Sequence, residues 1–121
     1  MGKKIVIVDD DHSIKSIFEF ILMQVGYEVL TKETGAEAEA IVKEEKDLSL
    51  MFLDSSLPDT ESEALCEKLL KENPKLPIVI MANIQQAEIL NDIFRIGAYG
   101  IIYKPFDVEE VLGIIPSILG E

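Results

Sequence analysis

Five times along this chain, a short apolar run is followed by a segment whose apolar residues recur at helical spacing. An apolar run without polar alternation predicts a strand buried on both faces, and apolar residues at i, i+3 and i+4 predict an amphipathic helix. Strict alternation of the two favours a parallel sheet covered by helices on both faces, an α/β fold. The predicted strands are Lys4–Val8, Glu28–Thr31, Leu50–Leu53, Ile78–Met81 and Ile101–Tyr103.

Capping patterns and helix breakers set the limits of the predicted helices. The first helix has a stripe formed by Ile14, Ile17, Phe18, Ile21, Leu22 and Val25. Capping pairs open the second, third and fifth helices, namely Thr34 with Glu37, Thr60 with Glu63, and Asp107 with Glu110. Gly26 and Gly97 are placed to close the first and fourth helices. Pro116 should end or kink the fifth, because proline lacks the N–H that a helix interior uses.

The length of 121 residues predicts one domain over residues 1–121, because this is the size of a typical single domain. The single cysteine, Cys66, excludes an internal disulfide and a cysteine-based zinc cluster. No apolar run approaches the roughly 20 residues needed to cross a bilayer, and the N-terminus does not resemble a signal peptide. We therefore expect a cytoplasmic location.

The net charge of −12 argues against nucleic-acid binding by this domain, because contacts to phosphates need a basic face. Most of the acids are expected to form a solvated surface. Nucleotide binding is also disfavoured, because no glycine-rich loop follows the first predicted strand.

Charged side chains follow several of the predicted strands directly. Parallel strands end at one edge of the sheet, where such folds bind ligands. The residues at these ends are Asp9, Asp10 and Asp11 after the first strand, Asp54 after the third, Ala82 and Asn83 after the fourth, and Lys104 after the fifth. Crowded carboxylates repel one another unless a cation neutralises them, and hard oxygen ligands suit Mg²⁺. Asp11 is also well placed to cap the first helix, and His12 is interpreted as a surface residue.

Three segments together resemble the signature blocks of two-component response-regulator receiver domains of the chemotaxis-receiver type. They are IVIVDDD (5–11), MFLDSSLPD (51–59) and GAYGIIYKPF (97–106), and the resemblance covers the whole chain. It implies a three-layer, flavodoxin-like (βα)₅ fold with strand order 2-1-3-4-5. It also implies a phosphorelay module that accepts a phosphoryl group from a histidine kinase or a phosphotransfer protein.

Carried over to this sequence, the resemblance makes Asp54 the phosphoacceptor. Mg²⁺ would be bound by Asp9, Asp10, Asp54 and the backbone carbonyl of Ser56, and Lys104 would contact the phosphoryl oxygens. These roles agree with the chemistry, because phosphoryl transfer needs positioning and neutralisation of negative charge. Such a domain is not an enzyme acting on other molecules, although it assists its own phosphorylation and dephosphorylation. The family also uses the side formed by the fourth helix, fifth strand and fifth helix for homodimers or output contacts.

The chain departs from the family at three positions. Ala82 stands where the family has Ser or Thr, Ile101 where it has an aromatic switch residue, and Ser62 where it has Gly. The missing switch pair leaves open a pseudo-receiver, which would bind protein partners without phosphorylation. Asp9-x-Asp11 also looks like the nucleophile motif of haloacid-dehalogenase-type phosphohydrolases. Ala82 and the short chain argue against that enzyme.

Overall fold

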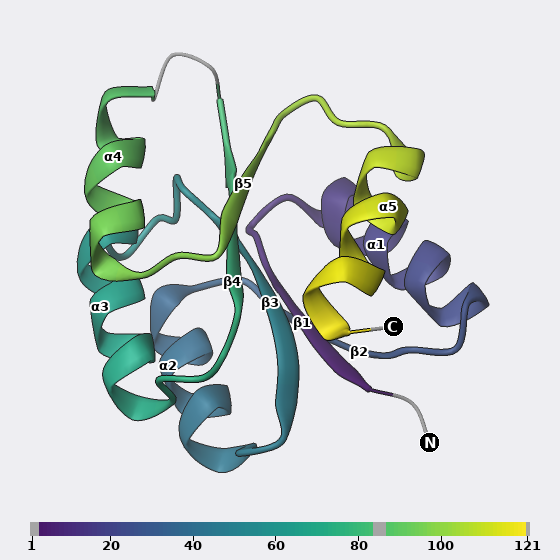
Figure 1. The fold of residues 1–121 in the computed structure, drawn as a ribbon, viewed down its shortest axis with the longest axis horizontal. Coiled ribbons are helices and arrows are strands. Elements are labelled where there is room, and N and C mark those ends of the chain that lie inside the picture. The colour runs from purple at the N-terminus through teal and green to yellow at the C-terminus, as the bar shows by residue number, and fades with distance from the viewer. Residues whose placement is uncertain (1–2, 84–86, 121) are drawn as a thin grey trace.

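The computed structural model describes residues 3–83 and 87–120, with the backbone alone at 87–90. Within these residues, strands and helices alternate along the chain as the sequence predicted (Figure 1). The strands are β1 (Lys4–Val8), β2 (Glu28–Lys32), β3 (Leu48–Asp54), β4 (Ile78–Ala82) and β5 (Gly100–Tyr103). The helices are α1 (His12–Gln24), α2 (Gly35–Glu44), α3 (Ser62–Glu72), α4 (Ala87–Ile96) and α5 (Val108–Leu119).

The strands form one parallel sheet in the order β2-β1-β3-β4-β5, which confirms the predicted topology. The register pairs Val6 of β1 with both Leu30 and Met51, on its two neighbours. The central strands β1, β3 and β4 are almost wholly buried, whereas the edge strand β2 is half-exposed. Continuous apolar runs therefore mark the strands that are covered on both faces.

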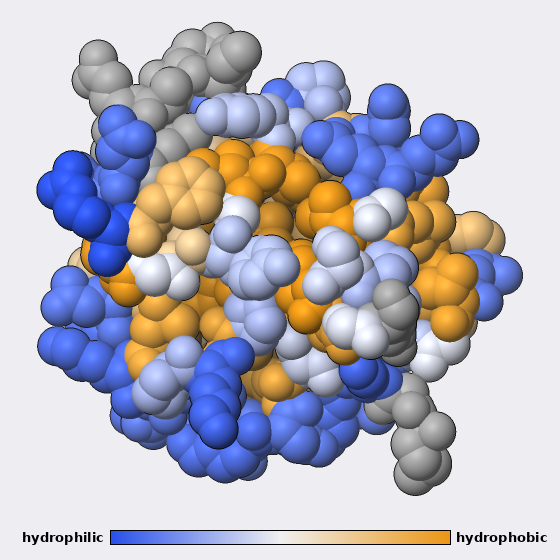
Figure 2. All heavy atoms as spheres, in the orientation of Figure 1, coloured by the Kyte–Doolittle hydropathy of each residue, from blue (hydrophilic) through white to orange (hydrophobic). Residues whose placement is uncertain are grey.

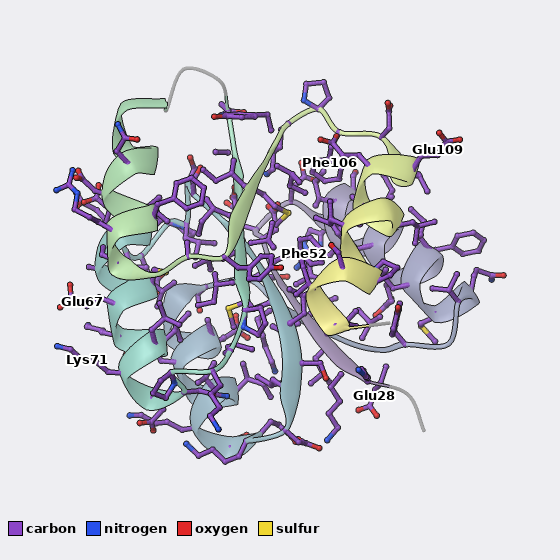
Figure 3. The ribbon with its side chains drawn as sticks, viewed as in Figure 1. Glu28, Phe52, Glu67, Lys71, Phe106 and Glu109 are labelled. Carbon is purple, nitrogen blue, oxygen red and sulfur yellow. The ribbon has the colours of Figure 1, made fainter. Side chains whose placement is uncertain are left out.

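Helices cover both faces of the sheet, with α1 and α5 on one side and α2, α3 and α4 on the other (Figure 1). Successive residues of each strand face opposite layers, so Phe52 packs with α1 and α5 while Leu53 packs with α2 and α3. The Phe18 ring lies between two others, with centroids 4.9 Å from Phe52 and 5.3 Å from Phe106. Figure 3 shows Phe52 in the interior, whereas Glu67 extends from α3 into solvent.

Of the three predicted capping pairs, one is confirmed and two are wrong. Thr34 accepts a hydrogen bond from the Glu37 N–H at 3.1 Å, which confirms the cap of α2. The predicted pairing of Thr60 with Glu63 does not open the third helix, because α3 begins at Ser62 with Glu61 as its N-cap residue. The Thr60 hydroxyl instead donates to the Glu61 carbonyl, at 3.3 Å. Asp107 is the N-cap residue of α5, as its position predicted, but its side chain makes no capping hydrogen bond.

Pro116 was predicted to end or kink the fifth helix, and it does not end it, because α5 continues to Leu119. The Gly120 N–H donates to the Pro116 carbonyl, and Gly120 has the left-handed conformation with φ of 74°. Val111 and Ile115 before the proline are buried, and Ile118 and Leu119 after it are partly buried against the same core, so packing holds the helix onto the sheet on both sides of Pro116.

Exposed apolar side chains gather in two regions. On α1 and just after it, Ile17, Phe20, Met23 and Val25 are exposed, so the predicted α1 stripe is wrong at two of its positions. Around α4 and β5, Phe94, Tyr99 and Tyr103 are exposed. Figure 2 shows apolar side chains on the surface between α4 and α5, bordered by charged ones. Among the described residues, no helix is both long enough and apolar enough to cross a bilayer.

Candidate functional site

Three carboxylates meet at the carboxyl edge of the sheet, where the sequence predicted a site. Asp9 follows β1 and is fully buried, Asp10 is exposed, and Asp54 ends β3 with only 4% of its surface exposed. One oxygen of each carboxylate lies within 4.8 Å of the other two. Adjacent strands of a parallel sheet end side by side, so residues 45 positions apart form one acidic cluster.

Lys104 joins this cluster from the end of β5. Its ammonium donates to Asp9 Oδ2 at 2.8 Å and to Asp54 Oδ1 at 3.1 Å. Its own N–H donates to the Ala82 carbonyl at 2.8 Å, which fixes the residue at the end of β4. The Lys104–Pro105 peptide bond is cis. A single cation therefore contacts two of the three acids.

The electrostatics of the site follow from its burial. Burial and the nearby Asp9 charge raise the pKa of Asp54, and the opposing effect of Lys104 does not cancel this rise. Burial acts to lower the pKa of Lys104, but its hydrogen bonds and the charges of Asp9 and Asp54 outweigh burial and raise it. With all groups ionised, three carboxylates face one ammonium, which leaves an excess of two negative charges.

Comparison with known proteins identifies the family to which this chain belongs. Residues 5–116 match the family described as the response regulator receiver domain. The chain belongs to the response regulator receiver domain family. The structure brings Asp9, Asp10, Asp54 and Lys104 of this receiver domain together at the carboxyl edge of the sheet.

Relatives of this receiver domain include regulators of transcription. It is 36% identical to a probable transcriptional regulator, ycf27, of Porphyra purpurea, over 97% of this chain and 47% of that protein. It is 31% identical to the alkaline phosphatase synthesis transcriptional regulatory protein PhoP of Bacillus subtilis, over 98% of this chain and 49% of PhoP. The chain therefore spans about half the length of these relatives.

A solved structure agrees with the fold throughout. The response regulator receiver domain protein (CheY-like) from Methanospirillum hungatei JF-1 superposes with a TM-score of 0.94 at 32% sequence identity. The match covers 99% of this receiver domain and 95% of that protein.

The acidic cluster of this receiver domain fits a divalent cation. Its ligands would be hard carboxylate oxygens, which Mg²⁺ prefers, and the excess of two negative charges equals the charge of that ion. Receiver domains generally bind Mg²⁺ in such an acidic pocket. Exposed Asp10 leaves the cluster open to solvent on one side, which suits an ion that keeps several of its waters.

The other acids and the histidine beside the cluster have separate partners. Asp11 accepts hydrogen bonds from the N–H groups of Ser13 at 2.8 Å and Ile14 at 3.3 Å, so it caps α1 as expected. An Asp9-x-Asp11 acid pair of the phosphohydrolase type is therefore disfavoured. His12 Nε2 lies 3.7 Å from Glu33 on the exposed rim.

The two atypical switch positions lie beside the cluster. Ala82 is buried at the end of β4 and presents no hydroxyl. Ile101 is partly buried against the core cluster beneath α3 and α4, and no aromatic side chain stands at that position. These two departures therefore lie on the strands next to Asp54 and Lys104, whereas the third, Ser62, begins α3.

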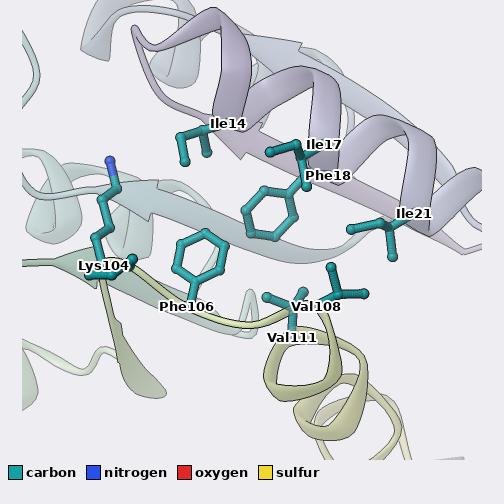
Figure 4. A pocket seen from close by; sticks show the side chains of 9 residues that line it. Ile14, Ile17, Phe18, Ile21, Lys104, Phe106, Val108 and Val111 are labelled. Carbon is teal, nitrogen blue, oxygen red and sulfur yellow. The ribbon is translucent and has the colours of Figure 1, made fainter.

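A cavity of about 270 Å³ adjoins the site between α1 and the segment after β5 (Figure 4). Its walls are almost entirely apolar, and Lys104 stands at one end (Figure 4). The lining residues that Figure 4 labels are Ile14, Ile17, Phe18, Ile21, Lys104, Phe106, Val108 and Val111.

Sequence reasoning missed two charged residues near the site. Lys15 is buried on α1 and donates to Glu33 at 2.6 Å, although its sequence position suggests a solvated lysine. Asp59, in the loop after Asp54, accepts hydrogen bonds from the first N–H groups of α2. No local pattern indicates either contact, because the partners lie 18 and 24 positions away.

The lone cysteine behaves as expected for a core residue. Cys66 is fully buried on α3, and burial raises the pKa of its thiol to about 11. The thiol therefore stays protonated at neutral pH and is a weak nucleophile.

Proposed function

We propose that this domain accepts a phosphoryl group on Asp54 from a phosphohistidine of a histidine kinase or phosphotransfer protein. The observation that carries the proposal is the placement of Asp54. It ends β3, with Oδ1 3.1 Å from the Lys104 ammonium and its carboxylate grouped with Asp9 and Asp10. A nucleophilic carboxylate beside a cation and a metal-binding cluster meets the needs of phosphoryl transfer.

In this mechanism, an Asp54 oxygen forms the new bond to phosphorus. The bond from phosphorus to the donor imidazole breaks, and its electron pair goes to the imidazole nitrogen. Asp54 must be ionised to attack, and its raised pKa makes the carboxylate a stronger base and a better nucleophile once it is ionised. Lys104 pairs with Asp54 before transfer and would move to a phosphoryl oxygen as negative charge develops there.

Asp9, Asp10, Asp54 and the backbone carbonyl of Ser56 would hold Mg²⁺. When bound, the ion neutralises charge on the phosphoryl oxygens. Asp9 has a second role, because its Oδ1 accepts the Asp11 N–H at 2.9 Å while its Oδ2 holds Lys104. These contacts fix the loop after β1 and orient the lysine. The domain would act only on itself, by assisting its own phosphorylation and dephosphorylation.

The direct test is incubation with acetyl phosphate and Mg²⁺, followed by intact mass measurement and peptide mapping. We expect the mass of one phosphoryl group to be gained at Asp54, and we expect Asp54→Asn to abolish the gain. Asp107→Asn is a matched control, because Asp107 is exposed and, in the described part of the chain, its side chain makes no capping hydrogen bond. Modification at Asp9 or Asp11 would contradict the assignment.

The second candidate function is a phosphorylation-independent pseudo-receiver. The buried Ala82 favours it, because no hydroxyl is available there to bond a phosphoryl oxygen. The same experiment separates the two functions. A chain that binds partners but gains no phosphoryl group from acetyl phosphate or from a histidine kinase would be a pseudo-receiver.

The family and the exposed apolar residues together indicate which protein partners this domain contacts. Receiver domains interact with histidine kinases and output domains. We propose that the side formed by α4, β5 and α5 contacts an output domain or a second copy of the chain. Exposed Phe94, Tyr99 and Tyr103 support this, because apolar surface favours protein contact.

A cytoplasmic location agrees with a kinase-linked role, and the net charge of −12 disfavours direct nucleic-acid binding by this domain.

A further inference from the structure

The loop that follows Asp54 is attached to the start of α2 by one carboxylate. Asp59 Oδ1 accepts the Gly35 N–H at 2.8 Å, and Oδ2 accepts the Ala36 N–H at 3.1 Å. These are the first two N–H groups of the helix, which have no partner inside it. The two bonds lower the pKa of Asp59, so the carboxylate is charged at neutral pH and also favoured by the helix dipole.

Two separate devices therefore cap the same helix end. Thr34 accepts the Glu37 N–H at 3.1 Å, and Glu37 in return accepts the Glu33 N–H at 3.1 Å. This local cap involves only the residues where α2 begins. Asp59 is different, because it belongs to the acceptor loop and joins it to α2. Removing either cap weakens the helix end, but only Asp59 also holds the loop.

Gly35 makes the close approach possible. A Cβ atom at this position would clash with the Thr60 methyl and lie 3.3 Å from Asp59 Oδ1. A larger residue would force the Thr60 side chain, or the loop that carries it, to shift. Sequence pattern alone assigns Gly35 no such role, because it looks like an ordinary first residue of a helix.

The acceptor loop is held at three points besides the hydrogen bond that the Ser56 backbone makes to the Asp54 carboxylate. The Ser55 N–H donates to the Met81 carbonyl at 3.0 Å, Leu57 is buried in the core, and Asp59 is attached to α2. Exposed Ser56 lies between the first two of these points. In the described residues, α3 offers no side-chain cap that would hold the far end of the loop. Asp59 is consequently the polar side chain that secures that end.

We propose that Asp59 is a positioning residue for the phosphoacceptor site. By holding the loop on α2, it would keep the Ser56 backbone carbonyl in place as a ligand for Mg²⁺. This role rests on the proposed function. Without the Asp59 carboxylate, the loop would sample other positions and the carbonyl would be available only part of the time.

The test compares Asp59→Ala with Thr34→Ala, which removes the local cap of the same helix. Mg²⁺ affinity is measured by calorimetry, and amide hydrogen exchange of residues 55–60 is measured on the metal-free proteins. We expect Asp59→Ala to weaken Mg²⁺ binding roughly tenfold, the scale typical of residues that orient metal ligands. Its loop amides should also exchange faster. Thr34→Ala should lose comparable thermal stability but keep wild-type Mg²⁺ affinity and loop protection.

Two further variants guard against a folding defect. Asp59→Asn keeps an acceptor oxygen without the charge and should be intermediate in Mg²⁺ affinity. Gly35→Ala improves helix propensity while displacing Thr60, so weaker Mg²⁺ binding in this variant could not come from a frayed helix.

Several results would overturn the role. If Asp59→Ala binds Mg²⁺ as the wild type does, or if Thr34→Ala weakens binding equally, Asp59 is merely a helix cap. Those results leave the proposed function standing, provided that the wild type binds Mg²⁺ and gains a phosphoryl group. A wild-type chain that does neither would overturn the proposed function and the role of Asp59 with it.

Discussion

At the scale of single residues, the site depends on a carboxylate whose burial disfavours its charged form. Asp54 is 4% exposed and has Asp9 as a neighbour, and burial and that charge both raise its pKa. Lys104 offsets part of this cost with its hydrogen bond at 3.1 Å. A buried charge of this kind reduces stability unless it is fully compensated, so its presence favours a functional role over a structural one.

This leads to a prediction about the dependence of stability on pH. A carboxyl group with a raised folded-state pKa binds its proton more tightly in the folded state than in the unfolded chain. Its effect on stability is therefore unfavourable above the folded-state pKa and fades as the pH falls toward the ordinary value. We expect metal-free Asp54→Asn to be more stable than the wild type at pH 7, and this advantage to shrink toward pH 4.

Urea unfolding of both proteins at several pH values, in the presence of a chelator, measures this difference. Asp107→Asn serves again as the control, because the aspartate it replaces is exposed. If Asp54→Asn were less stable than the wild type at pH 7, Lys104 would more than compensate the buried charge.

At the scale of elements, β4 and β5 connect the site to the surface around α4. Ala82 and Ile101 lie on these neighbouring strands, and both are apolar. A receiver domain responds to phosphorylation only through contacts that differ between its two states. Ile101 packs against the core beneath α3 and α4 in place of a ring that could turn. The chain therefore lacks both side chains of the usual coupling.

We predict that phosphorylation changes the surface around α4 and β5 only slightly. A charge-assisted hydrogen bond from a hydroxyl at position 82 is worth roughly 1.5–3 kcal/mol. Shifting a two-state equilibrium from 1:99 to 99:1 takes about 5.5 kcal/mol. Losing that bond therefore removes a large part of the free energy by which phosphorylation would shift the equilibrium. The measurement is the change in amide chemical shifts on adding beryllofluoride and Mg²⁺, which should stay near Asp54.

Ala82→Ser is the matched variant, because it restores the hydroxyl, and its shifts should spread further. Large wild-type shifts across 84–96 and 101–103 would refute the prediction; of these, 84–86 lie outside the described residues. Asn83→Ala would then show whether that neighbouring amide has taken over the coupling.

At the scale of the whole molecule, the site exists only when the sheet is complete. Asp9 follows β1, Asp54 ends β3, and Lys104 follows β5. The unfolded chain has no such cluster, so an ion that binds it stabilises the folded state by mass action. The excess of two negative charges makes this effect specific for divalent ions over monovalent salt.

We expect Mg²⁺ at tenfold excess over its Kd to stabilise the domain by roughly 1.4 kcal/mol. That corresponds to a rise of a few degrees in the melting temperature of a domain of this size. Thermal unfolding with Mg²⁺, with Ca²⁺ and with NaCl at equal ionic strength provides the comparison. Asp10→Asn should reduce the response. No change with millimolar Mg²⁺ would argue against a shared metal site.

The order of the elements, the parallel sheet and the edge at which the acids meet could all be predicted from the sequence. These features depend on the local spacing of apolar residues and on positions directly after strands, and both can be read along the chain. For the same reason, the strand-end positions alone were enough to group Asp9, Asp10, Asp54 and Lys104. The family resemblance added the strand order and the chemical roles.

The pairing of polar groups across the fold, in contrast, depends on how the elements pack together. Thr60 and Glu63 match a capping box, yet α3 begins without one, and Asp59 caps α2 instead. Ile17 lies at a core spacing but is exposed, whereas Lys15 is buried against Glu33. Periodicity shows which residues share a face of a helix, but not how far a neighbouring element covers that face. Coverage and long-range pairing depend on all the elements together, so they become definite only when the sheet and its helices have packed.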